Sequence, residues 1–427
     1  MRRLSLYLFS LLLLVSFSGY SQEDILRQQV AFLADSIGNR YPASEGDFRA
    51  QNHIAEFFAD CDLQCDIQAF DIVEYIWGEG ALQLMDGDNN TIFLYGDDFS
   101  VSGKSPTDTI SAEYVVVTGN LPTPLLRLTR NKVVLCLQSP LAGLNERKLP
   151  LISDLIQAGA KAIIFVQPPG KNITQRLTKG NRSPLPERIP ILFLNYESLS
   201  PFIPTSILDE SKGNLYFASP EAKIQIATIH HDKHIQAANI IGLKRGNSDN
   251  YIIVGAHYDT CGPDPETGEI RPGANDNASG VAMLMALAKR LSGQETRHNF
   301  LFVAFSGEEK GLLGSLHFVE NMPFQPEQVT EMINLDMVGR MTDNTLYYRQ
   351  YHKKNEAPQS TPCIVLKNQD GGNSDHSEFA RLDIPTSCFH TGTDPMIHTP
   401  GDTADRLNYE GMARILDFLT DYILKLD

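Results

Sequence analysis

Apolar and polar residues follow a regular alternation in the last part of the chain, from about Ile224 to Asp427. Short apolar runs typical of buried strands alternate there with runs whose apolar residues recur every three or four positions, as on one face of a helix. Strands are expected at Ala238–Leu243, Tyr251–Ala256, Asn299–Phe305, Met332–Met337, Cys363–Lys367 and Thr386–Phe389, and helices at Ser279–Leu291 and Tyr409–Leu426. The alternation predicts an α/β fold with a mixed, mainly parallel sheet flanked by helices.

The preceding parts of the chain have different patterns. Helical spacing of apolar residues around Ile25–Leu33 and Ile54–Phe58 is followed by the alternation of a strand from Cys65 to Tyr75. From Gly96 to Pro220, apolar runs are separated by turns rich in Pro and Gly, and no cluster of acids, bases or nucleophiles stands out. We expect this middle region to be a small α/β domain, inserted into the main one and free of catalytic residues.

The N-terminus has the pattern of a secretory signal. Arg2 and Arg3 precede an apolar run from Leu4 to Phe17, which small residues follow before Gln22. The alternative is a membrane anchor, but a spanning helix needs about 20 apolar residues and this run is shorter. We expect export to the periplasm or the medium, and no membrane span after cleavage. The expected organisation is a signal at 1–21, the first part of the main domain at 22–95, the insert at 96–220 and the catalytic part at 221–427.

Composition narrows the classes of partner. The 427 residues are 42% hydrophobic and carry a net charge of −16, and loss of Arg2 and Arg3 with the signal makes the chain more negative still. Such a charge repels nucleic acid and anionic membrane surfaces, so neither is an expected partner. The six cysteines form no CxxC pair, which argues against a thiolate zinc site. Most are expected to be small buried residues, with Cys61 and Cys65 the closest pair for a disulfide.

Residues suited to binding a metal follow the predicted strands. His257 and Asp259 come directly after Tyr251–Ala256 and are two residues apart, so both point to one face, and Asp259 can accept a ring N–H of His257. A structural hydrogen bond is the alternative role of such a histidine. Asp276 precedes the predicted helix at Ser279, where a carboxylate can also serve as a helix cap.

Three further acidic side chains and one histidine complete the set of candidate residues. Glu308 and Glu309 follow the strand that ends at Phe305, and their repulsion requires a nearby positive charge or a shared proton, unless both lie in a solvated loop. Asp336 lies within an apolar strand, where a carboxylate is costly unless it is paired or ligating. His398 lies on a loop before the last helix.

Together these residues resemble the M28 family of zinc peptidases. The resemblance covers Asn239–Leu426 well and Glu23–Tyr95 loosely, and the middle region resembles the protease-associated (PA) insert of some members. The residues that match the family's motifs, in order, are His257, Asp276, Glu308, Glu309, Asp336 and His398.

The resemblance implies two zinc ions and a role for each matching residue. His257 and Asp336 would hold one zinc, Glu309 and His398 the other, and Asp276 would bridge them. A single zinc is the alternative, and cobalt or manganese can take the place of zinc at such ligands.

The remaining residues would serve the reaction and the substrate. Glu308 matches the general base, and Asp259 would orient His257. Ser374-Asp375-His376 resembles a family motif near the substrate pocket, against the alternative of a structural turn. The other pocket walls are expected on loops around Thr267–Pro272, Tyr347–Lys354 and Gly371–Asp394.

The implied function is the removal of single residues from the N-termini of peptides. A glutaminyl cyclase of similar fold is the alternative, but Asn275–Gly280 is similar to the hydrolases. A carboxypeptidase uses similar ligands and stays open, whereas a receptor-like ectodomain is disfavoured because every ligand position is filled. Neither the side-chain preference nor the oligomeric state is indicated by the sequence.

Overall fold

The structure is a computed structural model, which describes residues 22–103, 105–118, 121–137, 149–167, 188–203, 207, 214–264, 267–352, 357–369 and 372–427. The predicted signal at 1–21 lies outside the described residues and remains a prediction. The chain divides into two compact units. Unit 1 is formed by the residues up to Ile72 and from Ile235 to Asp427, and unit 2 by Val73–His234.

The centre of unit 1 is a mixed sheet with the strand order β14-β13-β15-β12-β10-β11-β9-β1. Strand β10 is parallel to both of its neighbours, β11 and β12, and β12 is parallel to β15. Strand β9 is antiparallel to its neighbour β11, and strand β13 is antiparallel to its neighbour β15. The bounds are β1 Gln64–Asp86, β9 Lys223–Lys244, β10 Tyr251–His257, β11 Asn299–Phe305, β12 Val329–Leu335, β13 Thr345–Tyr351, β14 Val365–Asn368 and β15 Thr386–His390. The predicted fold class, a mixed and mainly parallel sheet flanked by helices, is confirmed.

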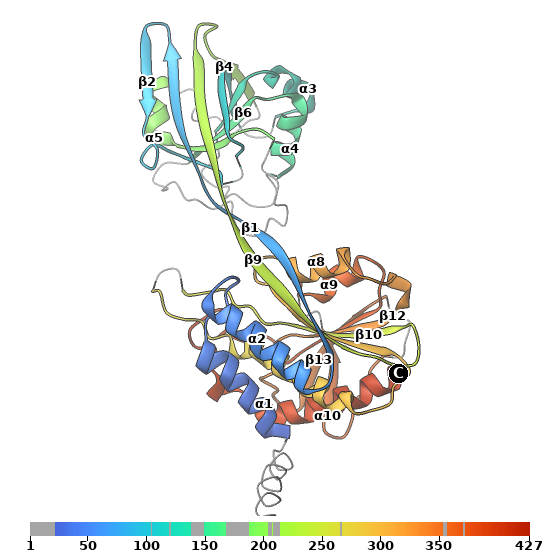
Figure 1. Ribbon diagram of the computed structural model, residues 1–427. Coiled ribbons are helices and arrows are strands. Elements are labelled where there is room, and N and C mark those ends of the chain that lie inside the picture. The colour runs from blue at the N-terminus through green and yellow to red at the C-terminus, as the bar shows by residue number, and fades with distance from the viewer. Residues whose placement is uncertain are drawn as a thin grey trace, which may run out of the picture. The chain divides into compact units, whose positions relative to one another are not determined.

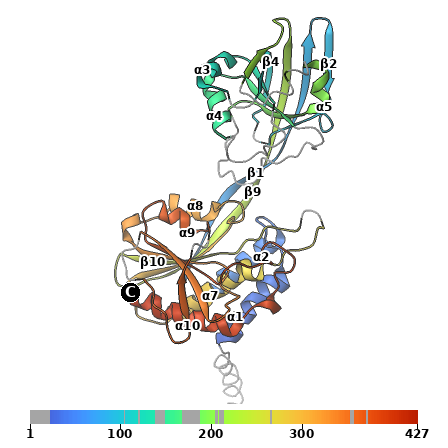
Figure 2. The ribbon, with the colours of Figure 1, turned by 180° about the vertical axis from the view of Figure 1, so that it is seen from behind.

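Helices cover both faces of this sheet (Figures 1 and 2). Helices α1, α2, α7 and α10 pack their apolar faces into one large core, whereas Phe318 of α8 and Phe379 of α9 pack into a second core on the opposite face. The bounds are α1 Gln22–Val30, η1 Ala31–Ile37, α2 Glu45–Asp60, η5 Ala274–Ala278, α7 Ser279–Ser292, α8 Leu313–Glu320, η6 Pro326–Gln328, α9 His376–Ala380, η7 Ala404–Arg406 and α10 Tyr409–Leu426.

The sequence sets the start and the buried face of helix α2. In α2, the Ser44 side chain accepts a hydrogen bond from the Asp47 N–H at 3.1 Å, which caps the helix. Its residues Ala50, Ile54 and Phe58, spaced four apart, are fully buried. The helix therefore lies against the sheet on its apolar stripe, as the spacing predicts.

Unit 2 has its own sheet and its own two apolar cores. The order β3-β7-β6-β5-β4-β8 places three parallel pairs at its centre, formed by β4, β5, β6 and β7. The bounds are β2 Asn89–Phe93, β3 Phe99–Val101, β4 Asp108–Thr118, α3 Thr123–Leu126, η2 Arg127–Thr129, β5 Val133–Leu137, α4 Leu149–Ala158, β6 Ala162–Gln167, β7 Ile191–Asn195, α5 Tyr196–Leu199, η4 Ser200–Phe202 and β8 Asn214–Phe217.

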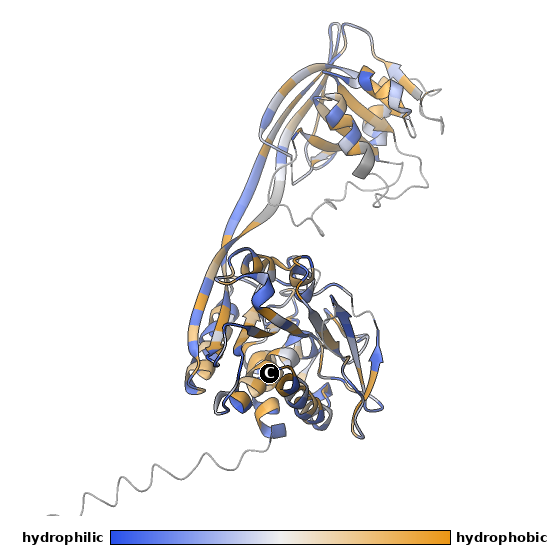
Figure 3. Cartoon of the chain, turned by 90° about the vertical axis from the view of Figure 1, so that its right-hand side faces the viewer, coloured by the Kyte–Doolittle hydropathy of each residue, from blue (hydrophilic) through white to orange (hydrophobic). Residues whose placement is uncertain are grey.

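The division between the units lies at other positions than the sequence predicts. The insert is expected at 96–220, but the compact unit runs from Val73 to His234. Two long strands, β1 and β9, each begin in one unit and end in the other. The boundary therefore falls inside continuous strands, and no break between elements marks it in the sequence. Within β9, the polar stretch 230–234 has no buried residue and separates two buried stretches, and it appears as a hydrophilic segment in Figure 3.

Some expected loops are regular elements. The segment Tyr347–Lys354 is expected as a loop, but its first five residues belong to β13, which pairs with β15. Helix α9 lies within the expected loop Gly371–Asp394. Pairing with β15 stabilises β13, and α9 has too few residues to show a helical period but buries Phe379 in the second core. Among the described residues, no helix has both the length and the apolar character needed to cross a membrane.

Replacing Phe302 with Ala should destabilise unit 1 by about 3–5 kcal/mol, because the residue is fully buried and its loss leaves a cavity. Its ring lies 6.3 Å from that of Phe300 and 6.4 Å from that of Phe58. Urea unfolding followed by circular dichroism measures the effect. Phe48→Ala is the control, since Phe48 is 50% exposed and should change stability little. Equal shifts for both variants would contradict this assignment of the core.

Candidate metal centre

The candidate site lies where the central strands of unit 1 end. His257 is the last residue of β10, Asp336 follows the end of β12 at Leu335, and Glu308 lies three residues beyond the end of β11. Because these strands are parallel neighbours, their carboxyl ends meet at one edge of the sheet. Asp336 is therefore not inside the strand, as the sequence suggests, but just past it, where its carboxylate faces the site.

The first group of possible ligands joins three predicted residues. His257 Nε2 lies 3.2 Å from Asp276 Oδ1 and 3.6 Å from Asp336 Oδ1. Their ligand atoms all lie within 4.8 Å of one another, close enough to hold one ion. His257 is 1% exposed. Among the described residues, neither its Nδ1 nor Asp336 Oδ1 makes a hydrogen bond.

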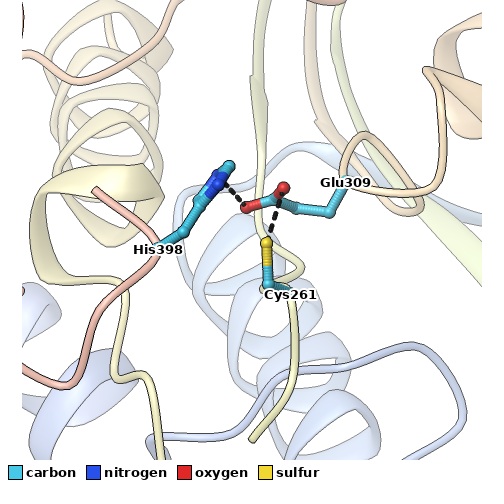
Figure 4. A group of neighbouring side chains, drawn as sticks. All are labelled: Cys261, Glu309 and His398. Atoms are coloured by element: carbon cyan, nitrogen blue, oxygen red, sulfur yellow. Dashed lines mark hydrogen bonds and ion pairs between the residues drawn. The ribbon is translucent and has the colours of Figure 1, made fainter. Parts of the chain in front are cut away.

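The second group joins two predicted residues with one that was not predicted. His398 Nε2 lies 3.1 Å from Glu309 Oε1, and Cys261 Sγ lies 2.9 Å from Glu309 Oε2. Figure 4 shows the three side chains pointing toward one another from separate loops. Cys261 was expected to be an ordinary small buried residue, because no second cysteine lies at a metal-binding spacing from it in the sequence. All six cysteines are free, so the suggested pair of Cys61 and Cys65 forms no disulfide.

Asp276 lies between the two groups. Its Oδ1 faces His257 at 3.2 Å and its Oδ2 faces His398 at 3.1 Å. The carboxylate does not cap α7; instead, Asn277 Oδ1 accepts the Gly280 N–H at 3.0 Å. Both oxygens of Asp276 are thus directed to the site, which is the arrangement that a bridging carboxylate needs.

Asp402, which the sequence reading missed, fixes the backbone of Asp276. Its Oδ2 accepts the Asp276 N–H at 3.0 Å, and its Oδ1 accepts the Asn275 N–H at 2.9 Å. Arg340 Nη2 lies 3.3 Å from Asp402 Oδ1 and supplies a positive charge. Asp402 follows His398 by four residues, but only the fold shows that it holds the loop of Asp276.

Asp259 binds the backbone of the two adjacent glutamates and not the ring of His257, which is the contact that the sequence predicts. Its Oδ1 lies 3.6 Å from His257 Nδ1, which is longer than a normal hydrogen bond. The same carboxylate accepts the backbone N–H of Glu308 at 3.1 Å and that of Glu309 at 3.2 Å. Asp259 therefore positions the two glutamates directly, and it lies beside His257 rather than bonded to it.

The two adjacent glutamates have separate environments. The Glu309 carboxylate contacts His398 and Cys261, whereas the Glu308 side chain is not in either ligand group. Burial raises the pKa of Glu308 well above its usual range, and nearby carboxylates such as Asp336 add to the rise. Glu308 is thus suited to hold a proton beside the ligand groups.

The site contains more acidic than basic side chains, so its carboxylates favour positive charge on the two histidines. Burial would lower the pKa of His257, but the charge of Glu308 and the facing carboxylates raise it well above its usual range. Hydrogen bonds with Asp276, Cys261 and Glu309 raise the pKa of His398 to about 12. Carboxylates that stabilise positive charge on two histidines in this way are suited to a cation. Histidine and carboxylate donors are those that zinc prefers, so the residues fit the metal implied by the sequence.

Arg40 is a second residue that the sequence reading missed. Its guanidinium is fully buried and donates to the carbonyl oxygens of Tyr258 at 2.8 Å, Pro272 at 2.7 Å and Gly273 at 2.9 Å, as well as to two in its own segment. Burial lowers its pKa to about 10, so it remains charged at neutral pH. Arg40 joins the loop after His257 to the loop before Asp276.

The motif Ser374-Asp375-His376 lies next to the first ligand group. Ser374 Oγ donates to Asp336 Oδ2 at 2.7 Å, so it orients one of the predicted ligands. All three residues are buried, and burial raises the pKa of Asp375 to about 7. The structure therefore places the motif beside Asp336; whether it also lines the substrate pocket remains a prediction.

Replacing Asp402 with Asn should lower metal affinity by about 10–100-fold, since partners that orient ligands typically contribute that much. The amide would present a donor to the N–H groups that Asp402 now accepts, and Asp276 would lose its position. Competition with a chelating dye measures the affinity. Asp405→Asn is the matched control, because Asp405 is exposed three residues away. Equal affinities for the two variants would show that Asp402 does not position Asp276.

Comparison with known proteins relates this chain to a family of peptidases. The model of peptidase family M28 matches residues 239–423. The chain is 25% identical to aminopeptidase YwaD of Bacillus subtilis over 413 residues, which is 92% of this chain and 82% of that protein. A probable leucine aminopeptidase of Trichophyton verrucosum is 29% identical over 215 residues, 44% of this chain and 58% of that protein.

A solved structure shares the fold. An aminopeptidase from Aneurinibacillus sp. strain AM-1 superposes with a TM-score of 0.61 at 23% identity, over 95% of this chain and 93% of that one. The predicted hydrolase class is confirmed by the family match, which includes all the predicted ligands and the predicted base. The chain therefore contains a metallopeptidase domain of peptidase family M28, over residues 239–423.

Proposed function

We propose that this protein is an exported zinc aminopeptidase that hydrolyses the N-terminal peptide bond of peptides. The observation that carries the proposal is the position of Asp276, whose two carboxylate oxygens face His257 at 3.2 Å and His398 at 3.1 Å. A carboxylate that faces two ligand groups at once is suited to two ions rather than one. The similarity to proteins named as aminopeptidases supports the choice of exopeptidase.

The ligands of the two ions follow from the two groups. His257 and Asp336 would hold one zinc, Glu309 and His398 the other, and Asp276 would contact both. Zinc bound there supplies a Lewis acid beside the scissile carbonyl and lowers the pKa of nearby water toward 7. Cobalt and manganese accept the same donors and can take its place.

Glu308 acts as the general base. Its side chain is outside both ligand groups, so its carboxylate is left to accept a proton beside them. Glu308 takes the proton from the water that attacks the peptide carbonyl and then gives it to the departing amine. Asp259 holds the backbone of Glu308 in place through its hydrogen bond of 3.1 Å.

Export rests on the N-terminal segment. Arg2 and Arg3, the apolar run after them and the small residues before Gln22 support a cleaved signal. N-terminal sequencing of the protein recovered outside the cytoplasm tests the proposal. A mature chain that begins at Gln22 would support it, and an intact Met1 in the cytoplasm would contradict it.

Glu308→Gln should lower kcat by about 10²–10⁴-fold, the range for loss of a general base, and leave the metal content unchanged. Glu309→Gln should instead weaken binding of one metal, and excess zinc should partly restore its activity because the base is intact. Zinc content and kcat on an aminoacyl nitroanilide are measured for both variants.

The adjacent positions make the two variants controls for each other. Loss of metal in Glu308→Gln together with its retention in Glu309→Gln would reverse the assigned roles. If both glutamates were only solvated loop residues, each substitution would change the free energy of unfolding by no more than about 0.5 kcal/mol and would leave the kinetics unchanged.

Protein purified without chelators should contain about two zinc ions per chain, since the two groups share one bridging carboxylate. Removal of the metal should abolish hydrolysis, and addition of zinc should restore it. Elemental analysis is combined with a panel of aminoacyl nitroanilides, N-terminal Gln peptides and peptides probed for release of C-terminal residues. A single zinc with cyclisation of the Gln peptides would identify a glutaminyl cyclase instead, and C-terminal release would identify a carboxypeptidase.

A further inference from the structure

Cys261 lies within the candidate metal centre, yet none of the roles proposed above uses it. Its Sγ is 2.9 Å from Glu309 Oε2, and the other oxygen of that carboxylate is 3.1 Å from His398 Nε2. The three side chains form one of the two groups whose donor atoms all lie within 4.8 Å of one another (Figure 4). The sulfur therefore lies as close to the Glu309 carboxylate as the His398 imidazole does.

Four donors face a common space at this position. One small cavity is lined by Cys261 together with Asp276, Glu309 and His398. Asp276 Oδ2 is 3.1 Å from His398 Nε2, so its carboxylate belongs to the same set. Arg271 and Asp402 also line the cavity, but the Asp402 carboxylate is bound to the backbone N–H groups of Asn275 and Asp276, which leaves the thiol, the imidazole and the carboxylates of Asp276 and Glu309 as the donors.

The backbone holds Cys261 in this place. The chain turns directly after it at Gly262, which has a φ of +81°, and a side chain there would meet the Tyr41 ring at 2.8 Å. On the other side, Thr260 accepts the Arg40 backbone N–H at 3.0 Å. These two features fix the course of the chain on both sides of Cys261.

We propose that the Cys261 thiolate is a fourth protein ligand of the metal held by Asp276, Glu309 and His398. The proposal rests on the proposed function, because it assumes metal at this position. In a tetrahedral zinc site with bonds of about 2.0–2.3 Å, neighbouring donors lie about 3.3–3.8 Å apart. The separations here are 2.9 and 3.1 Å. The donors must therefore move apart by about 0.2–0.9 Å to form the tetrahedron.

This fourth ligand makes the two metal positions different. The position at His257 and Asp336 has three protein donors, counting Asp276, and keeps an open coordination site, as a catalytic zinc requires. The position at His398 would have four protein donors, with the thiolate as the additional one. A thiolate also favours soft ions, so this position should prefer zinc or cadmium over manganese.

Cobalt replacement tests the proposal because thiolate ligation gives an intense near-ultraviolet charge-transfer band that oxygen and nitrogen donors do not give. The metal-free protein is titrated with one and then two equivalents of Co²⁺, and the spectrum and the affinity at each step are recorded. The wild type should show the band, and Cys261→Ser should lose it and bind one of the two ions at least 10-fold more weakly. Cys363→Ser is the control, since Cys363 is exposed and belongs to neither ligand group; it should retain the band.

The outcomes separate this proposal from the proposed function. Two bound cobalt ions and aminopeptidase activity without a charge-transfer band in the wild type would overturn the proposal and leave the function intact. The thiol would then only donate a hydrogen bond to Glu309. A band that is lost in Cys261→Ser, in a protein that cleaves no aminoacyl nitroanilide, would support the ligand and contradict the function. The wild-type spectrum decides the question even if Cys261→Ser fails to fold.

Discussion

The structure of unit 1 depends on the collection of several carboxylates in one largely buried place. Asp259 and Asp402 are almost completely buried, and Asp276 and Glu309 lie beside them. Charges of one sign at such distances repel each other strongly in a medium of low dielectric constant, and each carboxylate also loses hydration. The arrangement persists only because positive charges and hydrogen-bond donors are provided at the same place.

Arginine side chains of the protein supply part of this positive charge, and a bound metal ion would supply the rest. Arg40 is fully buried beside the site, and Arg340 pairs with Asp394 at 2.6 Å and with Asp402 at 3.3 Å. Arg340 faces two carboxylates that accept backbone N–H groups, whereas Arg40 donates to backbone carbonyl oxygens and its charge acts on Asp259 and Asp402 without a direct contact. The carboxylates that point inward, such as that of Asp276, face the two histidines instead. Because some carboxylates bind the backbone and others face the histidines, one cluster of acidic residues can both fix the loops and bind metal.

The rigidity of the site follows from the same contacts. Arg40 connects the loop after β10 to the loop that leads into α7, and Asp259 connects the loop after β10 to that after β11. The segments that carry Glu309 and Asp276 are therefore each fixed by a carboxylate from another loop, whereas His257 is the last residue of a strand. Both candidate ligand groups found among the described residues lie in unit 1. The proposed thiolate ligand would extend the same principle, since Cys261 is held by the turn at Gly262.

The sequence by itself determined the fold class, the family and the list of candidate ligands, because strand and helix periods and the polar residues after each strand are local features. His257 and Glu309 could be found from the apolar strands before them. The roles of Arg40, Asp402 and Cys261 were decided only by the tertiary structure. Arg40 is 218 residues from Tyr258, whose carbonyl it binds, and Asp402 is 126 residues from Asp276. A periodic pattern in the sequence gives no information on contacts between distant residues. The sequence likewise gives no sign of the boundary between the units. The strands β1 and β9 cross it as continuous elements, and only the separation of the buried clusters reveals it.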